Sequence, residues 1–297
     1  MPTISNQRIE NAMRKIVITL MLGAAAALLF PSALPAADTE STPFPGVRHV
    51  RRQTTAPREI DMHIVLVDLN RPGVRITTTG PNDDPDTQTD FETTRQFVKR
   101  TGARIGINGG FFGYTRKAVE TGKGDLCSLA VSDGKLVCGW GHNQHDAVNI
   151  GADNTVTFVR RANDDKTGSA TNPEVKLYNA IAGNVRLIEA GKILAKDGNP
   201  TYPQTVVGHT ADHHLILFVS DGRQPGFSEG MTYEEVAGVL KEFGAVDAIA
   251  FDGGGSATMV MADGKDGETK VLNRPSDGKE RAVGNNLGVI ISDKLQQ

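Results

Sequence analysis

The sequence has few cysteines, few aromatic residues and no strong excess of charge of either sign. Of its 297 residues, two are cysteine, one is tryptophan and 5% are aromatic, whereas 33 are glycine. Scarce aromatics with plentiful glycine favour strands and turns over a helical architecture. The net charge of −3 comes from interspersed acids and bases, which argues against a nucleic-acid-binding stripe.

Long apolar runs are also missing, apart from one near the N-terminus. Residues 16–30 are almost wholly apolar, follow Arg14-Lys15, and precede small residues at Ala36 and Ala37. This is the pattern of a secretory signal peptide, which we predict over residues 1–37. A membrane anchor is the alternative, but the run is short for a span, so we expect no stable span after cleavage. The mature protein is then secreted or periplasmic.

The rest of the chain reads as one domain preceded by a short arm. Residues 38–57 are polar and contain proline, which predicts an N-terminal arm or linker, and residues 58–297 can form a single compact domain. Short apolar runs separated by turn residues predict strands, and Thr232 with Glu235 forms a capping box that begins a helix ending at Gly244. A helix capped by Thr89 or Asp90 is expected to end at Gly102. We predict an α+β fold: a strand-rich mixed sheet core with a few peripheral helices. Strands are expected at residues 60–68, 74–79, 103–107, 156–159, 178–188, 205–209, 214–220, 246–251 and 287–292.

Three of these strands end in the same way. Each apolar run stops at a polar side chain followed by glycine: Asn108, Asp221 and Asp252. If the strands share one sheet and end on the same side, two carboxylates and an amide converge. That set suits acid, base or nucleophilic chemistry at a sugar.

The segment after Asp252 has the strongest local signal. Gly253, Gly254 and Gly255 permit a sharp turn whose N–H groups can form a nest for an anion, and Ser256 adds a hydroxyl. The alternative is a tight turn in which Asp252 caps its own backbone.

Cys127 and Cys138 flank a predicted hairpin with its turn near Asp133-Gly134. Cross-strand proximity there, together with export, points to one disulfide.

With these motifs in view, the chain resembles the phosphodiester glycosidases. The matching segments follow the family's order and span about residues 60–292. They are NGGFF (108–112), VSDGKLV (131–137), AIAGNVRLIEAGKI (180–193), TVVGH (205–209), LILFVSDGR (215–223), GMTYEEVAGVL (230–240) and FDGGGSATMV (251–260). Gln204 departs from the pattern, because family members often carry arginine there.

The resemblance implies hydrolysis of a sugar joined at C1 to a phosphodiester, with release of the free sugar and a phosphomonoester. An envelope glycan is a candidate substrate, and we predict no cofactor and no metal ion in the site. On the residues, we expect Asp252 as principal carboxylate, Asp221 as the second, and Asn108 orienting a sugar hydroxyl. Arg223, His209 and Arg281 are candidates to bind phosphate. Further substrate-binding candidates are Gly109, Gly110, Asn184, Arg186, Thr205, Gly253, Gly254, Gly255 and Ser256.

Two other functions stay open at this point. One is a non-catalytic glycan-binding module of the cell envelope. The other is a metal-dependent phosphodiesterase, for which His142, His145 and Asp146 or the pair His213-His214 would supply ligands.

Overall fold

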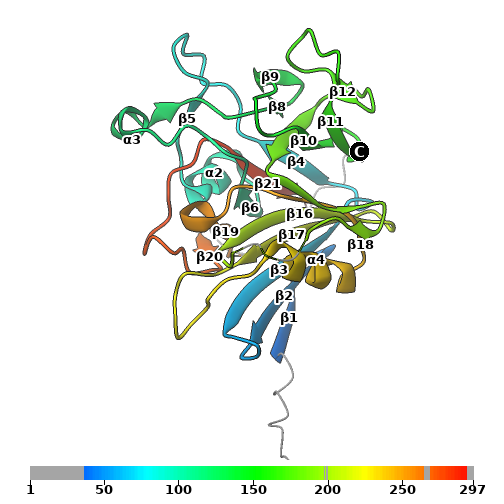
Figure 1. Ribbon diagram of the computed structural model, residues 1–297, viewed down its shortest axis with the longest axis vertical. Helices are drawn as coiled ribbons and strands as arrows, with labels where there is room; N and C mark the ends of the chain where they lie inside the picture. Colours follow the sequence, from blue (N-terminus) through cyan, green and yellow to red (C-terminus); the bar gives the residue numbers. More distant parts are fainter. Residues whose placement is uncertain (1–36, 197, 199, 264–267, 293–297) are drawn as a thin grey trace, which may run out of the picture. The chain divides into compact units, whose positions relative to one another are not determined.

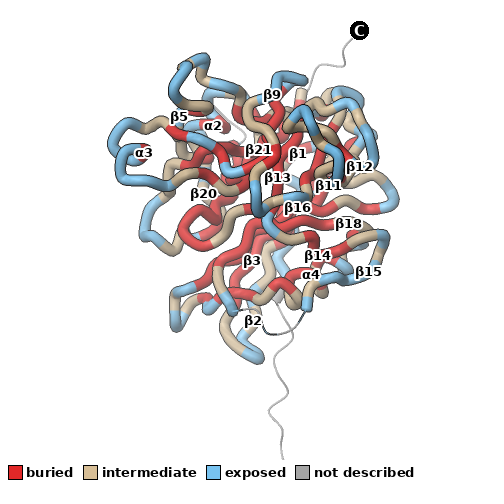
Figure 2. The backbone as a smooth tube through the Cα atoms, turned by 45° about the horizontal axis from the view of Figure 1, so that its top comes forward, coloured by how far each residue is buried: buried red, intermediate tan, exposed pale blue. Residues whose placement is uncertain are grey.

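The central strand β17 (His214–Ser220) shows how this sequence forms its main sheet. Its apolar run is uninterrupted because both faces are buried. Leu215 and Leu217 face one hydrophobic core, and Ile216 and Phe218 face another. The computed structural model describes residues 37–196, 198, 200–263 and 268–292. Figure 2 shows the buried backbone running along the central strands and the exposed backbone in the peripheral loops.

β17 lies within an eight-stranded sheet (Figure 1). One face packs against the other sheets, and the opposite face packs against helix α4 (Tyr233–Glu242). In spatial order the strands are β1 (Ala37–Phe44), β2 (Val47–Thr54), β3 (Ile60–Asp68), β17, β16 (Gln204–Thr210), β18 (Ala245–Ala250), β14 (Val185–Glu189) and β15 (Lys192–Ile193).

Three further sheets complete the described domain. The six-stranded sheet contains β12 (Thr171–Asn172), β11 (Val156–Arg161), β10 (Asp146–Ile150), β13 (Asn179–Gly183), β8 (Ala130–Ser132) and β9 (Lys135–Cys138). The five-stranded sheet contains β20 (Thr269–Val271), β19 (Met259–Ala262), β6 (Ile105–Asn108), β21 (Asn286–Ile291) and β4 (Val74–Thr78), and the smallest pairs β5 (Thr89–Asp90) with β7 (Lys123–Gly124).

The helices are short and capped. α4 (Tyr233–Glu242) begins at the predicted capping box of Thr232 and Glu235. α2 (Thr94–Thr101) ends at Gly102 as predicted, but it begins at an N-cap on Thr93, and Thr89 and Asp90 are strand instead. α3 (Arg116–Thr121) and the 3-10 helix η1 (Gly254–Ser256) follow strands of the candidate site.

The strand-rich single domain is confirmed, but the expected mixed sheet is wrong. Every strand pairing in the described residues is antiparallel, and the strands divide among several sheets. The predicted strand 178–188 breaks at Gly183, so that β13 and β14 belong to different sheets. Residues 38–57, expected to be an arm or linker, form most of β1 and β2, which pair with each other and, through β2, with β3.

The predicted signal peptide over residues 1–37 falls almost wholly outside the described residues. Within the part of the chain that is described, no helix has the length and apolar character needed to cross a membrane.

The expected disulfide is a second correction. Cys127 and Cys138 are both free thiols. The hairpin register, shifted by a bulge, places Cys138 opposite Ala130, whereas the backbone of Cys127 lies against Gly141. The turn that pairs Ser132 with Lys135 already sets Cys138 two positions away from Cys127, and the bulge increases that offset to three.

Candidate active site at the glycine turn

Asp252 lies directly after β18, where three elements meet. Its N–H donates to the carbonyl oxygen of Gly109 at 3.1 Å, and its own carbonyl oxygen accepts from Asn108 Nδ2 at 2.7 Å. These bonds attach the end of the eight-stranded sheet to the end of β6 in the five-stranded sheet. Two of the three predicted strand ends, at Asn108 and Asp252, therefore meet, although they come from two sheets and not from one.

Each glycine after Asp252 packs against a different neighbour. A Cβ on Gly253 would lie 2.5 Å from the carbonyl oxygen of Pro203, and one on Gly255 would overlap Arg281. Gly254 has a φ of +60°, and a Cβ there would lie 3.0 Å from Arg223 Nη1. The turn needs glycine both for its backbone conformation and for the close approach of two guanidinium groups.

The Asp252 carboxyl is partly exposed and lies in a mixed environment. Burial raises its pKa above the usual value, whereas a hydrogen bond from Ser256 and the charges of Arg281 and Arg223 act in the opposite direction. A carboxyl with such opposing influences, placed beside two cations, is a candidate for a catalytic role.

The two arginines differ in how they are held. Arg281 pairs with Asp277 at 2.6 Å, donates to Ser256 Oγ at 3.3 Å, and lies 4.8 Å from the centre of the Tyr114 ring. The exposed side chain of Arg223 makes no hydrogen bond or ion pair within the described residues. Its guanidinium group is therefore available to an anionic ligand.

Three polar side chains lie on the Gly253 side of the turn. Tyr202 approaches Gly253, and its hydroxyl donates to the hydroxyl of Tyr233 at 3.2 Å. The exposed Asn184 donates from Nδ2 to the same hydroxyl at 2.9 Å. Burial raises the pKa of Tyr233, and the nearby charge of Asp252 contributes to that rise. This group offers hydroxyl and amide contacts of the kind that a sugar requires.

Asn108 does not face a substrate, contrary to the predicted role. It is fully buried, and its Oδ1 accepts from Thr205 Oγ1 at 2.7 Å and from the Thr258 N–H at 3.1 Å. Thr205 is equally buried. Both residues therefore position the Asp252 backbone, and their buried side chains are engaged with each other.

Asp221 is also buried, with 1% of its surface exposed. It accepts from Asn273 Nδ2 at 3.1 Å and from the Arg274 N–H at 2.8 Å. Asn273 in turn binds the carbonyl oxygen of Ala257, just after η1. Burial raises the pKa of Asp221 to about 7 against the opposing effect of these hydrogen bonds. Through Asn273, the buried Asp221 supports the glycine turn. Its position does not suit a second catalytic carboxylate.

Two phosphate or substrate candidates lie elsewhere. Arg186 is buried, pairs with Asp247 at 2.7 Å, and stacks 4.4 Å from the centre of the Phe158 ring. His209 is opposite Asp247 in the strand register and contacts His213 at 3.3 Å. Asp247 lies within β18, five residues before Asp252, and an extended chain of that length spans up to roughly 17 Å. Neither side chain belongs to the glycine-turn site.

Gly109 and Gly110 allow close backbone packing beside the site. A Cβ on Gly109 would overlap Asn285, and one on Gly110 would overlap the carbonyl oxygen of Ala182. Their role in the structure is to let β6 approach its neighbours, which places Asn108 under Asp252.

The histidine motifs do not assemble a ligand set. His145 Nε2 lies 2.8 Å from the carbonyl oxygen of His142, and His213 contacts His209. Within the described residues, no group of three or more histidine, cysteine or acidic side chains is placed to hold a metal ion.

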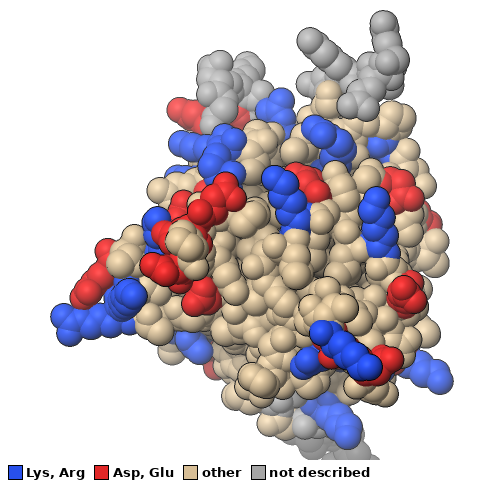
Figure 3. Space-filling model, turned by 90° about the horizontal axis from the view of Figure 1, so that it is seen from above, with Lys and Arg blue, Asp and Glu red and all other residues tan. Residues whose placement is uncertain are grey.

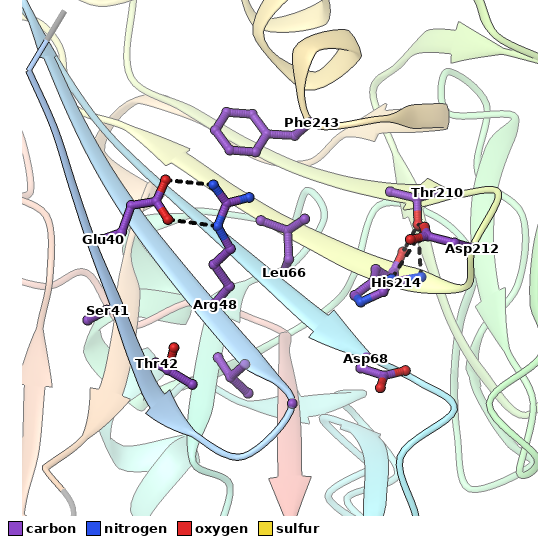
Figure 4. Close-up of a pocket in the computed structure, with 12 residues that line it drawn as sticks. Glu40, Ser41, Thr42, Arg48, Leu66, Asp68, Thr210, Asp212, His214 and Phe243 are labelled. Carbon is purple, nitrogen blue, oxygen red and sulfur yellow. Dashed lines mark hydrogen bonds and ion pairs between the residues drawn. The ribbon is translucent and has the colours of Figure 1, made fainter.

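Two cavities lie at different distances from this site. One of about 280 Å³ adjoins the turn through Arg281 and Asp277. Another of about 560 Å³ lies at the opposite end of β16 and is shown in Figure 4. There Arg48 and Glu40 form a two-bond ion pair, at 2.6 and 3.0 Å, and Asp212 binds Thr210 and His214. The larger cavity is therefore remote from Asp252.

The sequence patterns missed several residues of the site. Tyr202, Asp277 and Tyr114 carry no local motif, and Tyr233 reads only as the first residue of a capped helix. Only a comparison of aligned family sequences could have marked them, because packing brings each residue to the turn and its position relative to neighbours in the sequence does not.

The fold and site together define a class: a domain of antiparallel sheets with a glycine turn that follows Asp252 and packs against Arg223, Arg281 and the carboxyl group of Asp277. A sequence model of the phosphodiester glycosidase family matches residues 101–290. The chain therefore belongs to that family.

The most informative relatives carry the same enzyme name. The mouse N-acetylglucosamine-1-phosphodiester alpha-N-acetylglucosaminidase is 31% identical over 175 residues, covering 54% of this chain and 32% of the mouse protein. The human enzyme is 27% identical, covering 57% of this chain and 34% of its own length. The alignments thus span about a third of these relatives.

Solved structures share the fold. The zebrafish catalytic domain of that enzyme, described as auto-inhibited by its pro-peptide, superposes with a TM-score of 0.63 at 24% identity, covering 88% of this chain and 89% of its own. A hypothetical protein from Synechocystis gives a TM-score of 0.65 at 14% identity, covering 88% of this chain and 64% of its own.

Proposed function

We propose that this chain is an exported glycosidase that cleaves the bond between a sugar C1 and a phosphodiester. The products are the free sugar and a phosphomonoester. The observation that carries the proposal is the partly exposed Asp252, set between Arg223 and Arg281 on a turn that only glycine can form. Export rests on the signal-like segment at residues 16–30.

Each residue of the site has a separate proposed role. Arg223 and Arg281 bind the phosphate, and Asn184 with the two tyrosine hydroxyls binds the sugar. Asp252 supports the positive charge that develops at C1 or activates the attacking water. The phosphate is a good leaving group and needs little protonation, so the single partly exposed carboxyl of Asp252 suffices. Water contributes its oxygen to C1, and its proton goes to the medium.

The direct test uses a panel of sugar-1-phosphodiesters in water enriched in ¹⁸O. Cleavage between C1 and oxygen places the label in the released sugar, whereas attack at phosphorus places it in the phosphate. Label in the sugar supports the proposal. Label in the phosphate would make the protein a phosphodiesterase. Tight glycan binding without release of product would favour the non-catalytic binding module.

A further inference from the structure

The 280 Å³ cavity beside Arg281 has apolar walls. Phe91, Tyr114, Ala118 and Val119 line it, and Arg281 belongs both to this cavity and to the glycine turn. Phe91 and Tyr114 each contact Phe112 edge-on, at 5.0 and 5.8 Å between ring centres. Phe112 belongs to the segment that leaves β6 beside Asn108, so this aromatic wall is fixed to the same strand end as the site.

Most polar groups of the cavity are already engaged; within the described residues the exception is the exposed ammonium group of Lys279. Asp277 pairs with Arg281 at 2.6 Å, and Glu280 pairs with Arg95 at 2.8 Å. Thr93 is occupied by the capping box of α2. A ligand with many hydroxyl groups would find few partners here, and a hydrogen-bonding group that enters without a partner loses free energy.

Two large side chains that line the cavity are unusually accessible. Tyr114 is 55% exposed and Val119 is 53% exposed, which makes them more exposed than the other large apolar side chains that reach the surface of the described residues. Large apolar side chains that gather at a surface hollow commonly mark a ligand site. The face seen in Figure 3 has charged side chains of both signs spread around a mainly uncharged centre.

The two sides of the glycine turn differ in chemistry. Gly253 faces the polar group of Tyr202, Tyr233 and Asn184, whereas Gly255 faces Arg281 and the apolar cavity. A phosphate held by the arginines would direct its sugar to the first side and its other substituent to the second. We propose that this cavity binds the alcohol side of the phosphodiester and selects an apolar alcohol, an alkyl chain or a single aromatic ring. The inference rests on the function proposed above.

The size of the cavity limits the occupant. At about 30 Å³ for each water molecule, the cavity holds roughly nine of them, which corresponds to a short chain or one ring.

The test compares phosphodiesters with one sugar and three alcohols: methyl, octyl and a hexose. We expect kcat/KM for octyl to exceed the methyl and hexose values by roughly 10-fold or more. Val119→Asn should bring the octyl-to-methyl ratio close to one. Leu136→Asn is the matched control, since Leu136 is 50% exposed on β9 and does not line the cavity. This control should keep the ratio of the unmodified protein.

Failure of the inference is distinguishable from failure of the proposed function. Hydrolysis with equal values for all three alcohols, a preference for hexose, or a ratio unchanged in Val119→Asn would overturn the apolar subsite and leave the glycosidase standing. If none of the three is hydrolysed, the proposed function fails. Calorimetry of substrate binding then tests whether the cavity binds an apolar alcohol. Octyl bound at least 10-fold tighter than methyl, with the difference lost in Val119→Asn, supports the apolar site, and equal affinities overturn it.

Discussion

At the scale of single residues, Asp252 carries the proposed chemistry. Replacing it by asparagine keeps the shape of the side chain and removes the charge beside the two arginines. We expect sugar release to fall by ~10²–10⁴-fold without unfolding. Rates and circular dichroism would be compared with Asp86→Asn, a control at an exposed loop position. Equal rates in both variants would remove Asp252 from the mechanism.

The pH dependence of the rate belongs to the same residue. Burial raises the pKa of Asp252, so the carboxylate is lost as pH falls through a value above 3.8. The acid limb of the rate profile should therefore lie above that of an ordinary aspartate.

Asp221 predicts a pH dependence of stability. The folded protein keeps this proton up to about pH 7, whereas the unfolded chain releases it near 3.8. The folded state binds more protons in that interval, so the free energy of unfolding falls as pH rises from about 4 to 7. Asp221→Asn removes this contribution. The stability of the natural protein relative to the variant should therefore fall by at most about 1.4 kcal/mol per pH unit.

Urea unfolding at several pH values measures this difference directly. Other titrating groups are common to both proteins and cancel in the comparison. Parallel pH profiles would show that Asp221 does not hold its proton in the folded state.

At the scale of elements, the glycine turn is the most constrained segment of the site. Gly254→Ala places a side chain at a φ of +60° and 3.0 Å from Arg223, so we expect a loss of roughly 1–2 kcal/mol and weaker binding of phosphodiesters. Gly238 lies inside α4 with open space around its Cβ position. Gly238→Ala should instead stabilise the protein by about 0.5–1 kcal/mol.

Urea unfolding and substrate titration of the two variants provide the measurement. If Gly254→Ala were as stable and as active as Gly238→Ala, close packing of the turn against Arg223 would not matter.

At the scale of the whole molecule, the free thiols predict how the protein responds to reductant. Removing a native disulfide typically costs about 2–5 kcal/mol, which would lower Tm by several degrees in a chain of this size. With Cys127 and Cys138 free, reductant should leave Tm unchanged. Thiol titration of the unfolded protein should detect two groups, with the exposed Cys127 reacting first in the folded state. A Tm that falls in reductant would show that the cysteines are bridged.

Local patterns in the sequence determined several elements almost to the residue. β3, the β16–β17 hairpin, and α4 with its cap follow from apolar runs, turn residues and a Thr-x-x-Glu spacing, all of which act within a few positions of the chain. The glycine turn after Asp252 follows from three glycines in a row. These features were predictable because their causes are neighbours in sequence.

Only the tertiary structure decided which polar residues reach the site. Arg186 pairs with Asp247, which is 61 residues away in the sequence, and therefore lies outside the site. Tyr202 and Arg281 reach the turn from loops that are remote in the sequence. Asn108 and Asp221 occupy strand ends as predicted, but their side chains are engaged in buried hydrogen bonds. Spacing cannot reveal this, because the direction of a side chain at a strand end depends on which sheet the strand joins and what packs over it.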